Sequence, residues 1–311
     1  MQENNMKAKK IIFVVFTVVA LAVFLFSCAH VGTVSQVGAG VLERMGIIDS
    51  RTAEAIAKSG VAWEQAFEEI TPEQEYFIGR AVAANILTAY RLETNRPELV
   101  AYLNKICMAL VINSPRPEIF NGYRVNILDT DEINAFATPG GHIFLTRGLI
   151  DLAPSEDALA AVIAHEIAHI QLQHGLLAIR NNRRTQAGMM TVFAMGGAAA
   201  DSAALDQLID IFGDTVNEVA TTIMVNGYSR AQELDADATA MALMALAGYY
   251  PGALIDMLQV LERELPRRRG GFNNTHPTAA DRIANAQKTA ASHQVPDTRS
   301  YRQARFIANT R

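Results

Sequence analysis

Two histidines flank a glutamate in the segment AAVIAHEIAHIQLQHG, which occupies residues 160–175. An α-helix turns by about 100° per residue, so His165 and His169 lie about 40° apart on one face, one turn from each other. Their imidazole rings can therefore bind one zinc ion, and a catalytic zinc site leaves one position for water. Glu166 lies about 100° from His165, where it can take a proton from that water without binding the ion. The spacing predicts a hydrolytic site with one Zn²⁺ per chain.

The rest of this helix is apolar on almost every side. Its small and branched residues are Ala160, Ile163, Ala164, Ile167, Ala168 and Ile170. A helix that is apolar all round is buried, and buried imidazole or carboxylate groups need partners, which a metal ion supplies. His174 follows His165 by nine residues, or about 900° of helix, and is expected on the opposite face in a structural role.

A third ligand has to come from elsewhere in the chain. The class with the pattern H-E-x-x-H-x-x-G-x-x-H is excluded, because Leu172 and Gly175 stand where it needs glycine and histidine. The segment SRAQELDADATAMALMALAG instead offers Glu233 as the third zinc ligand on a later helix. Asp237, one turn on, can accept the free ring N–H of a zinc histidine and fix its tautomer, and Asp235 is expected to face solvent.

Other segments predict the elements that carry these residues. Thr71 and Pro72 begin one helix, Ser155 caps the motif helix, and Ser229 with Gln232 forms a capping box. Further helices are expected at 97–112, 251–265 and 276–290, and strands at 123–129 and 142–146, the second after a Pro-Gly-Gly turn. The prediction is an α+β fold, a mainly helical zincin-type metallopeptidase with a small antiparallel sheet beside the H-E-x-x-H helix. The apolar residues within 176–228 are expected to pack without spanning a membrane.

The N-terminal sequence predicts an export signal followed by a lipid anchor. A lysine-rich start precedes the apolar run IIFVVFTVVALAVFLF at 11–26, which is short for a membrane span. The run ends in LFSC, which resembles a bacterial lipobox, so residues 1–27 are predicted to be a lipoprotein signal peptide and Cys28 the lipidated residue. An uncleaved signal anchor is the alternative. Because Ala29 replaces the aspartate that retains lipoproteins in the inner membrane, the periplasmic leaflet of the outer membrane is the expected location.

The remaining boundaries follow from composition. Residues 28–70 are predicted to form a lipidated tether and N-terminal helices, residues 71–295 the zinc metallopeptidase domain, and residues 296–311 a flexible tail. The formal net charge of −5 argues against a nucleic-acid partner, which would favour a basic surface.

Four segments in order are similar to one known family. NAFATPGGHIFLTRGLI, AAVIAHEIAHIQLQHG, YSRAQELDADATA and HPTAADRI resemble the gluzincin metallopeptidases that include the CAAX prenyl protease and HtpX. Within that family, the exported bacterial BepA- and LoiP-type lipoproteins or periplasmic peptidases are the most similar branch. The resemblance covers residues 71 to 290 or so and implies a zinc endopeptidase with His165, His169 and Glu233 as ligands and Glu166 as base.

The same resemblance implies roles for other residues. It suggests that HIFLT is an edge strand to which an extended substrate adds as a further strand. The residues of that edge are Asn134, Gly141, His142, Ile143 and Phe144. It also places His276, with Arg282 six residues on, near the metal, either to stabilise the oxyanion or to bind zinc as an extra ligand that closes the site.

Two hypotheses of function follow. The favoured one is a lipid-anchored periplasmic zinc endopeptidase that cleaves misfolded or unassembled envelope polypeptides. Its relatives in the membrane carry spans between the zinc motifs that are missing here, so prenylated proteins are not expected as substrates. The alternative is a chaperone-like or scaffolding periplasmic lipoprotein whose zinc site is structural or capped by its own chain.

Overall fold

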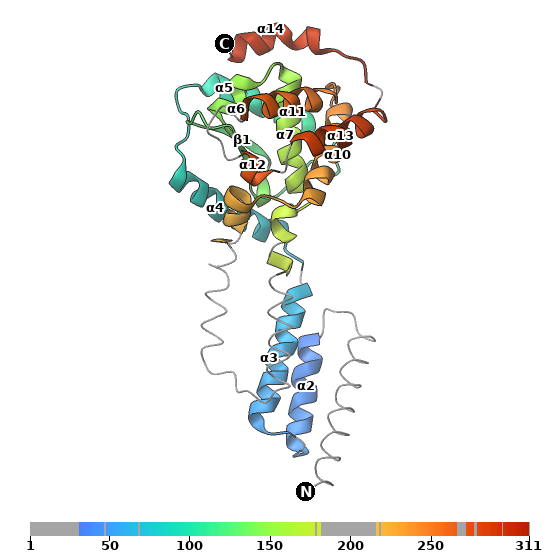
Figure 1. The fold of residues 1–311 in the computed structure, drawn as a ribbon. Helices are drawn as coiled ribbons and strands as arrows, with labels where there is room; N and C mark the ends of the chain where they lie inside the picture. Colours follow the sequence, from blue (N-terminus) through green and yellow to red (C-terminus); the bar gives the residue numbers. More distant parts are fainter. Residues whose placement is uncertain are drawn as a thin grey trace. The chain divides into compact units, whose positions relative to one another are not determined.

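The computed structural model describes residues 31–46, 48–67, 69–177, 179–181, 216–217, 219–265, 272–276, 279–293 and 295–310. The chain divides into two compact units, the first formed by residues 1–70 and 178–213, the second by residues 71–177 and 214–311 (Figure 1). The predicted signal peptide, Cys28 and most of residues 176–228 lie outside the described residues. In the part of the chain that is described, no helix is long and apolar enough to cross a membrane.

The first unit contains two helices that pack against each other, α2 (Val31–Arg44) and α3 (Ser50–Phe67). The Gly32 N–H donates to Glu64 Oε2 at 3.0 Å, which ties the start of α2 to α3. Within residues 28–70, predicted to form a tether and N-terminal helices, the chain is already helical from Val31. Small residues permit this packing: a Cβ at Gly32 would lie only 3.3 Å from the Val61 Cα.

The second unit carries every residue predicted for the site. Its described elements are α4 (Pro72–Ala89), α5 (Pro97–Val111), β1 (Arg124–Leu128), β2 (Ala135–Ala137), η2 (Pro139–Gly141), β3 (His142–Thr146), α6 (Arg147–Leu152), α7 (Glu156–Gln171), η3 (Thr222–Asn226), α10 (Arg230–Leu246), α11 (Ala253–Glu264), α12 (Phe272–Thr275), α13 (Ala279–Ala290) and α14 (Arg299–Thr310). The predicted caps are confirmed: Thr71 caps α4, Ser155 caps α7, and Ser229 with Gln232 forms the capping box of α10.

The sheet has the strand order β1-β3-β2, with β1 parallel and β2 antiparallel to β3. The predicted mainly helical α+β fold is confirmed, but the small sheet is mixed rather than antiparallel. Gly140 (φ 73°) and Gly141 (φ 101°) make the turn that returns the chain from β2 into β3. Since β3 is bonded on both sides, the prediction that HIFLT is an edge strand is wrong. The edge strands are β1 and β2, and β2 packs beside α7.

The outer edge of β1 is covered by a side chain and by a neighbouring segment. Asn104 on α5 donates to the Val125 carbonyl at 2.8 Å and accepts from the Val125 N–H at 2.9 Å. Two residues on, the Glu93 N–H donates to the Ile127 carbonyl at 2.9 Å. The backbone groups that β1 directs away from β3 are therefore satisfied at these two positions.

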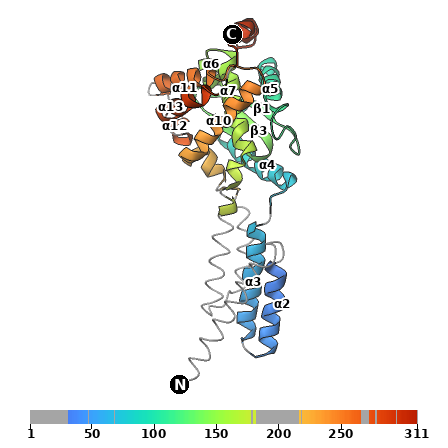
Figure 2. The same cartoon turned by 90° about the vertical axis from the view of Figure 1, so that its right-hand side faces the viewer.

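Helix α7 lies in the middle of the second unit, as two perpendicular views show (Figures 1 and 2). Every residue from Glu156 to Ile170 is buried, and the helix packs against α5, α10, α11 and β2. Its alanines allow this, because small side chains let neighbouring helices approach from several directions. Polar groups on α7 are consequently shielded from water.

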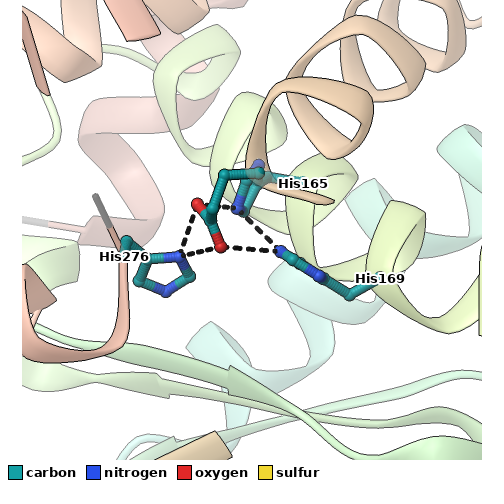
Figure 3. Close-up of side chains that lie close together, drawn as sticks. His165, His169 and His276 are labelled. Atoms are coloured by element: carbon teal, nitrogen blue, oxygen red, sulfur yellow. Dashed lines mark hydrogen bonds and ion pairs between the residues drawn. The ribbon is translucent and has the colours of Figure 1, made fainter. Parts of the chain in front are cut away.

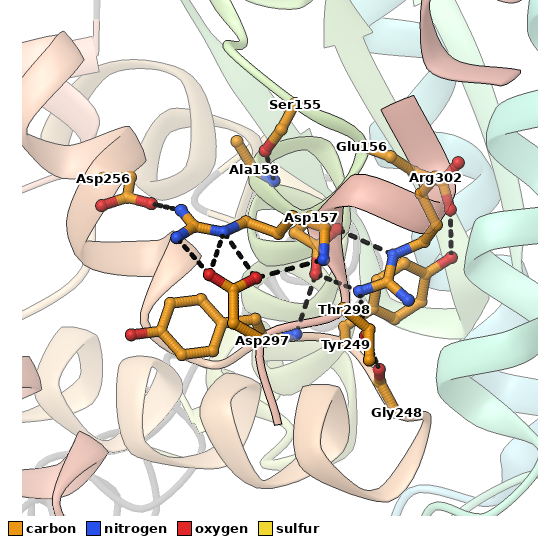
Figure 4. A network of polar contacts seen from close by, with 12 residues as sticks. Ser155, Glu156, Asp157, Ala158, Gly248, Tyr249, Asp256, Asp297, Thr298 and Arg302 are labelled. Carbon is orange, nitrogen blue, oxygen red and sulfur yellow. Dashed lines mark hydrogen bonds and ion pairs between the residues drawn. The ribbon is translucent and has the colours of Figure 1, made fainter. Parts of the chain in front are cut away.

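The two acidic residues in the first turn of α7 are buried and need cationic partners. Helix α14 supplies them: Arg302 donates to both oxygens of Asp157 at 2.6 and 2.8 Å (Figure 4). Arg305 pairs with Glu156. Phe306 on the same helix is 2% exposed. The prediction of a flexible tail at 296–311 is therefore wrong for residues 299–310.

Candidate metal centre and active site

Four side chains from three segments meet beside the middle of α7. His165 and His169 come from α7, Glu233 from α10 and His276 from the residue after α12 (Figure 3). One donor atom from each lies within 4.8 Å of the donor atoms of the others. Each of the four side chains is at most 4% exposed. The three ligands predicted from the spacing are thus brought together, and the histidine suggested by the resemblance joins them.

The donor atoms approach one another closely. His165 Nε2 lies 3.5 Å from Glu233 Oε2, and His169 Nε2 lies 3.4 Å from Glu233 Oε1. The two Nε2 atoms are 3.1 Å apart, and His276 Nδ1 lies 2.9 Å from both carboxylate oxygens. Three imidazoles and one carboxylate form a nitrogen and oxygen donor set that suits Zn²⁺.

Glu166 is also present at this centre, in a form that fits a base. It is 2% exposed, and its Oε1 has no hydrogen-bond partner among the described residues. An unpartnered buried carboxylate oxygen is costly unless a further group, such as a water held by a metal ion, completes the site. The donor set and this oxygen together fit a hydrolytic metal centre.

The second ring nitrogen of His165 contacts an ion pair. His165 Nδ1 lies 3.0 Å from Asp237 Oδ1, as the helical spacing predicts, and Arg282 donates to both oxygens of Asp237 at 2.7 and 2.8 Å. Burial and the Arg282 charge lower the pKa of His165, but hydrogen bonds to Asp237 and Glu233 outweigh them and place it at about 9. An ion that binds Nε2 would therefore displace a proton at neutral pH.

The second ring nitrogen of His169 contacts another histidine. Helix α7 ends at Gln171, because Gln173 adopts a φ of 56°. This break brings His174 back toward the helix, and its Nδ1 lies 2.9 Å from His169 Nδ1. The prediction that His174 lies on the opposite face is therefore wrong. Nothing in the sequence marks the break, since glutamine rarely adopts a positive φ.

Tyr228, which the sequence reasoning missed, covers the other side of His169. The two rings stack with centroids 4.1 Å apart and an angle of 17° between their planes. Its position in the sequence could have indicated this role. Tyr228 comes directly before Ser229, the capping residue of the helix that carries Glu233, so α10 holds it near the cluster. The stacked ring limits the rotation of His169 and excludes water from it.

For His169 and Glu233 the electrostatics favour the forms that bind a metal, a neutral imidazole and an ionised carboxylate. Burial lowers the pKa of His169 to about 3, despite its hydrogen bond to Glu233. Burial alone would raise the pKa of Glu233, but the charge of His276 and hydrogen bonds from the histidines hold it well below the usual range. Burial raises the pKa of Glu166, which makes this carboxylate a stronger base than an exposed one.

Asn134 links β2 to the segment that carries His276. Its Oδ1 accepts from the Ala135 N–H at 3.0 Å and from Thr275 Oγ1 at 3.2 Å. The Tyr228 N–H in turn donates to the Thr275 carbonyl at 3.3 Å. Gly227 (φ 72°) permits this approach, because a Cβ there would lie 2.3 Å from that carbonyl oxygen. These contacts hold His276 beside the cluster.

The other residues predicted for a substrate edge lie away from the contact between Asn134 and Thr275. Gly141 belongs to the turn before β3, and Ile143 and Phe144 are buried in that central strand. His142, the first residue of β3, stacks against Tyr76 with ring centroids 5.9 Å apart. Among these predicted edge residues, only Asn134 lies next to the strand edge that adjoins α7.

A buried H-E-x-x-H helix, a glutamate from a second helix and a small sheet beside them define a metallopeptidase-type domain. Residues 97–290 match the sequence family described as peptidase family M48. The chain therefore belongs to peptidase family M48, which confirms the predicted metallopeptidase class and the suspected gluzincin family.

Individual relatives are similar at moderate identity. The beta-barrel assembly-enhancing protease of Escherichia coli (strain K12) is 28% identical over 202 residues, which cover 63% of this chain and 40% of the relative. The mitochondrial metalloendopeptidase OMA1 of Schizosaccharomyces pombe is 24% identical over 234 residues, 74% of this chain and 65% of the relative. A protease HtpX homolog of Acaryochloris marina is 27% identical over 240 residues, 63% of this chain and 75% of the relative.

Proposed function

We propose that this chain is a zinc-dependent endopeptidase that hydrolyses misfolded or unassembled envelope proteins. The observation that carries the proposal is the unpartnered Oε1 of buried Glu166 beside the four-donor cluster. Membership of the M48 family and the name of the E. coli relative support a protease that acts in the assembly of envelope proteins. The location proposed with it is the periplasm, with Cys28 lipidated and held in the outer membrane.

The residues divide into ligands and a base. His165, His169 and Glu233 hold the metal, and zinc, when bound, polarises the peptide carbonyl and makes water more acidic. Glu166 accepts a proton from the attacking water at its free oxygen and later passes it to the leaving amine. Asp237 keeps the Nδ1–H of His165 in place, so the Nε2 lone pair of that ring points to the cluster.

His276 is proposed to cap the site in the arrangement described here. Its Nδ1 lies among the ligand atoms and contacts both oxygens of Glu233. This is where a further metal ligand would lie, whereas a group that stabilises the oxyanion would lie beside the substrate. The hydrogen bonds that hold Thr275 to Asn134 and Tyr228 keep it there. Cleavage then requires this segment to move aside so that substrate and water reach Glu166.

An extended substrate is proposed to add to β2 rather than to β3. Asn134 and Thr138 are hydrogen-bonded to β3, so Ala135 and Ala137 direct their backbone groups away from it. The Ala135 N–H is already bonded to Asn134 Oδ1, which leaves the Ala135 carbonyl and the backbone groups of Ala137 for a substrate. Backbone hydrogen bonds to that edge place a peptide alongside α7 with little demand on its side chains. A polypeptide that has failed to fold presents such extended segments.

The test of the base is Glu166→Gln in the full chain. The variant is expected to bind zinc with unchanged stoichiometry and to lose cleavage of unfolded casein by at least a hundredfold, because the amide cannot accept the proton. Asp235→Asn, an exposed change on α10, is the matched control and is expected to cleave like the wild type. Cleavage by Glu166→Gln at the wild-type rate would contradict the assigned base.

His276→Ala separates the protease from the chaperone-like alternative, which the fourth protein ligand favours. If His276 caps an enzyme, its removal is expected to raise the rate of casein cleavage several-fold, whereas an oxyanion role predicts a loss. If wild type and His276→Ala both bind zinc and leave casein intact, a structural zinc site in a chaperone-like protein is the better account. Cys28→Ser is expected to move the protein out of the membrane fraction.

A further inference from the structure

The two α7 histidines have chemically different partners behind them. His165 Nδ1 contacts the carboxylate of Asp237, which is itself paired with Arg282. His169 Nδ1 contacts the imidazole of His174 at 2.9 Å. Ligand histidines usually donate their second N–H to a carboxylate, a carbonyl or water. The imidazole of His174 is therefore an unusual partner for a ligand histidine.

A metal ion bound at the cluster would decide which nitrogen of His169 carries the proton. The His169 Nε2 lies in the four-donor cluster, 3.4 Å from Glu233 Oε1, so a metal bound there would take its lone pair and leave the proton on Nδ1. That Nδ1–H can donate to His174 only if His174 Nδ1 is unprotonated, which leaves the His174 proton on Nε2. A nitrogen–nitrogen distance of 2.9 Å is typical of such a hydrogen bond.

We propose that His174 is a positioning residue, which accepts the Nδ1–H of His169 and thereby fixes the tautomer and ring orientation of that ligand. The inference rests on the proposed function, since it concerns the same metal centre. The backbone supports it: Gln173 adopts a φ of 56°, and a helical turn begins at His174. His174 is 5% exposed, and Tyr228 also lies against its ring, with centroids 5.8 Å apart.

The consequence is a metal centre whose two imidazole ligands differ in electron donation. A carboxylate partner makes an imidazole a stronger donor, whereas a neutral imidazole partner orients the ring and adds no charge. His165 therefore has the anionic partner and His169 the neutral one. A second carboxylate in the place of His174 would reduce the positive charge that the ion presents to substrate.

The test compares His174→Leu with His174→Asn in the full chain. Asparagine places Oδ1 the same number of bonds from Cβ as histidine places Nδ1, so it can accept the same hydrogen bond, while leucine has a similar size and cannot. Zinc affinity is measured by competition with a chelator, and the visible spectrum of the Co²⁺-loaded protein reports the ligand geometry. His293→Leu, a change beyond α13, is the control.

The leucine variant is expected to bind zinc about 10- to 100-fold more weakly and to change the cobalt spectrum, which is the usual effect of losing such a partner. The asparagine variant is expected to stay within about threefold of the wild type, on the same reasoning. A leucine variant that binds zinc like the wild type overturns the proposal, and so does an asparagine variant as weak as the leucine one.

Two further outcomes are distinguishable. If the leucine variant does not fold, His174→Ala is titrated with zinc with and without free imidazole; recovery of affinity with imidazole supports the hydrogen bond, and no recovery overturns it. If the wild-type chain itself binds neither zinc nor cobalt, the proposed function fails, and the positioning role fails with it.

Discussion

Replacing Asp237 by asparagine removes one charge from an ion pair that is almost completely enclosed. Asp237 is 0% exposed and Arg282 is 2% exposed, so water cannot compensate for the lost charge. The carboxylate accepts three hydrogen bonds, one from His165 and two from Arg282. The amide of the variant keeps its shape but turns one of those acceptors into a donor that faces another donor.

The expected cost follows from these contacts. Two unit charges about 4 Å apart attract by about 4 kcal/mol at an effective dielectric constant of about 20. One charge-assisted hydrogen bond is worth about 1.5–3 kcal/mol, and removing one partner of a buried pair typically costs about 3–5 kcal/mol. These terms overlap, so Asp237→Asn is expected to lower the free energy of unfolding of the metal-free chain by about 3–4 kcal/mol.

Urea unfolding at pH 7, followed by circular dichroism, measures this loss. Asp235→Asn on the exposed side of α10 is the matched control and should change stability by less than about 0.5 kcal/mol. The double variant Asp237→Leu with Arg282→Met removes both charges and is expected to recover part of the loss. A cost below about 1 kcal/mol for Asp237→Asn, or no recovery in the double variant, would refute the view that this pair is held by its charges.

Three other changes test separate parts of the second unit. Phe306→Ala removes a side chain that is 2% exposed and should cost about 3–5 kcal/mol in urea unfolding; a cost near zero would mean that α14 does not pack on α7. Glu156 has a pKa below the usual 4.5: burial opposes this, but hydrogen bonds from Arg305 and Tyr102 outweigh it. A depressed pKa stabilises the fold above pH 4.5 and loses its effect as the pH falls, so the wild type should lose its stability advantage over Glu156→Gln when unfolding is compared between pH 7 and pH 3. Gly227→Ala places a Cβ 2.3 Å from a carbonyl oxygen of the segment before His276, so it should change casein cleavage in the same direction as His276→Ala, and opposite directions would contradict the capping contact.

Local patterns were enough to predict His165, His169 and Glu233, whereas His276 was suggested only by the family resemblance. The i, i+4 spacing of His165 and His169, and of Glu233 and Asp237, places each pair on one face of a helix whose start is marked by a cap. Both helices are apolar elsewhere and had to be buried, so their polar faces had to meet. The structure has this arrangement, with His165 Nδ1 3.0 Å from Asp237 Oδ1.

The errors concern features that local patterns do not determine. The position of β3 between β1 and β2 depends on how the chain crosses the sheet, and the sequence of a five-residue strand does not show this. The place of His174 depends on a positive φ at Gln173, and a glutamine in the sequence does not predict a positive φ. The order of the tail depends on Arg302 and Asp157, partners separated by 145 residues.

The amide of Asn104 has a consequence for where another strand could join the sheet. A sheet with two open sides could join to foreign strands, or to a copy of itself, in more than one direction. Here the side next to α5 is sealed at Val125 by one asparagine and at Ile127 by an adjoining stretch of its own chain. With these positions of β1 occupied, the strand addition proposed above is left to the flank of β2, beside the hydrolytic groups.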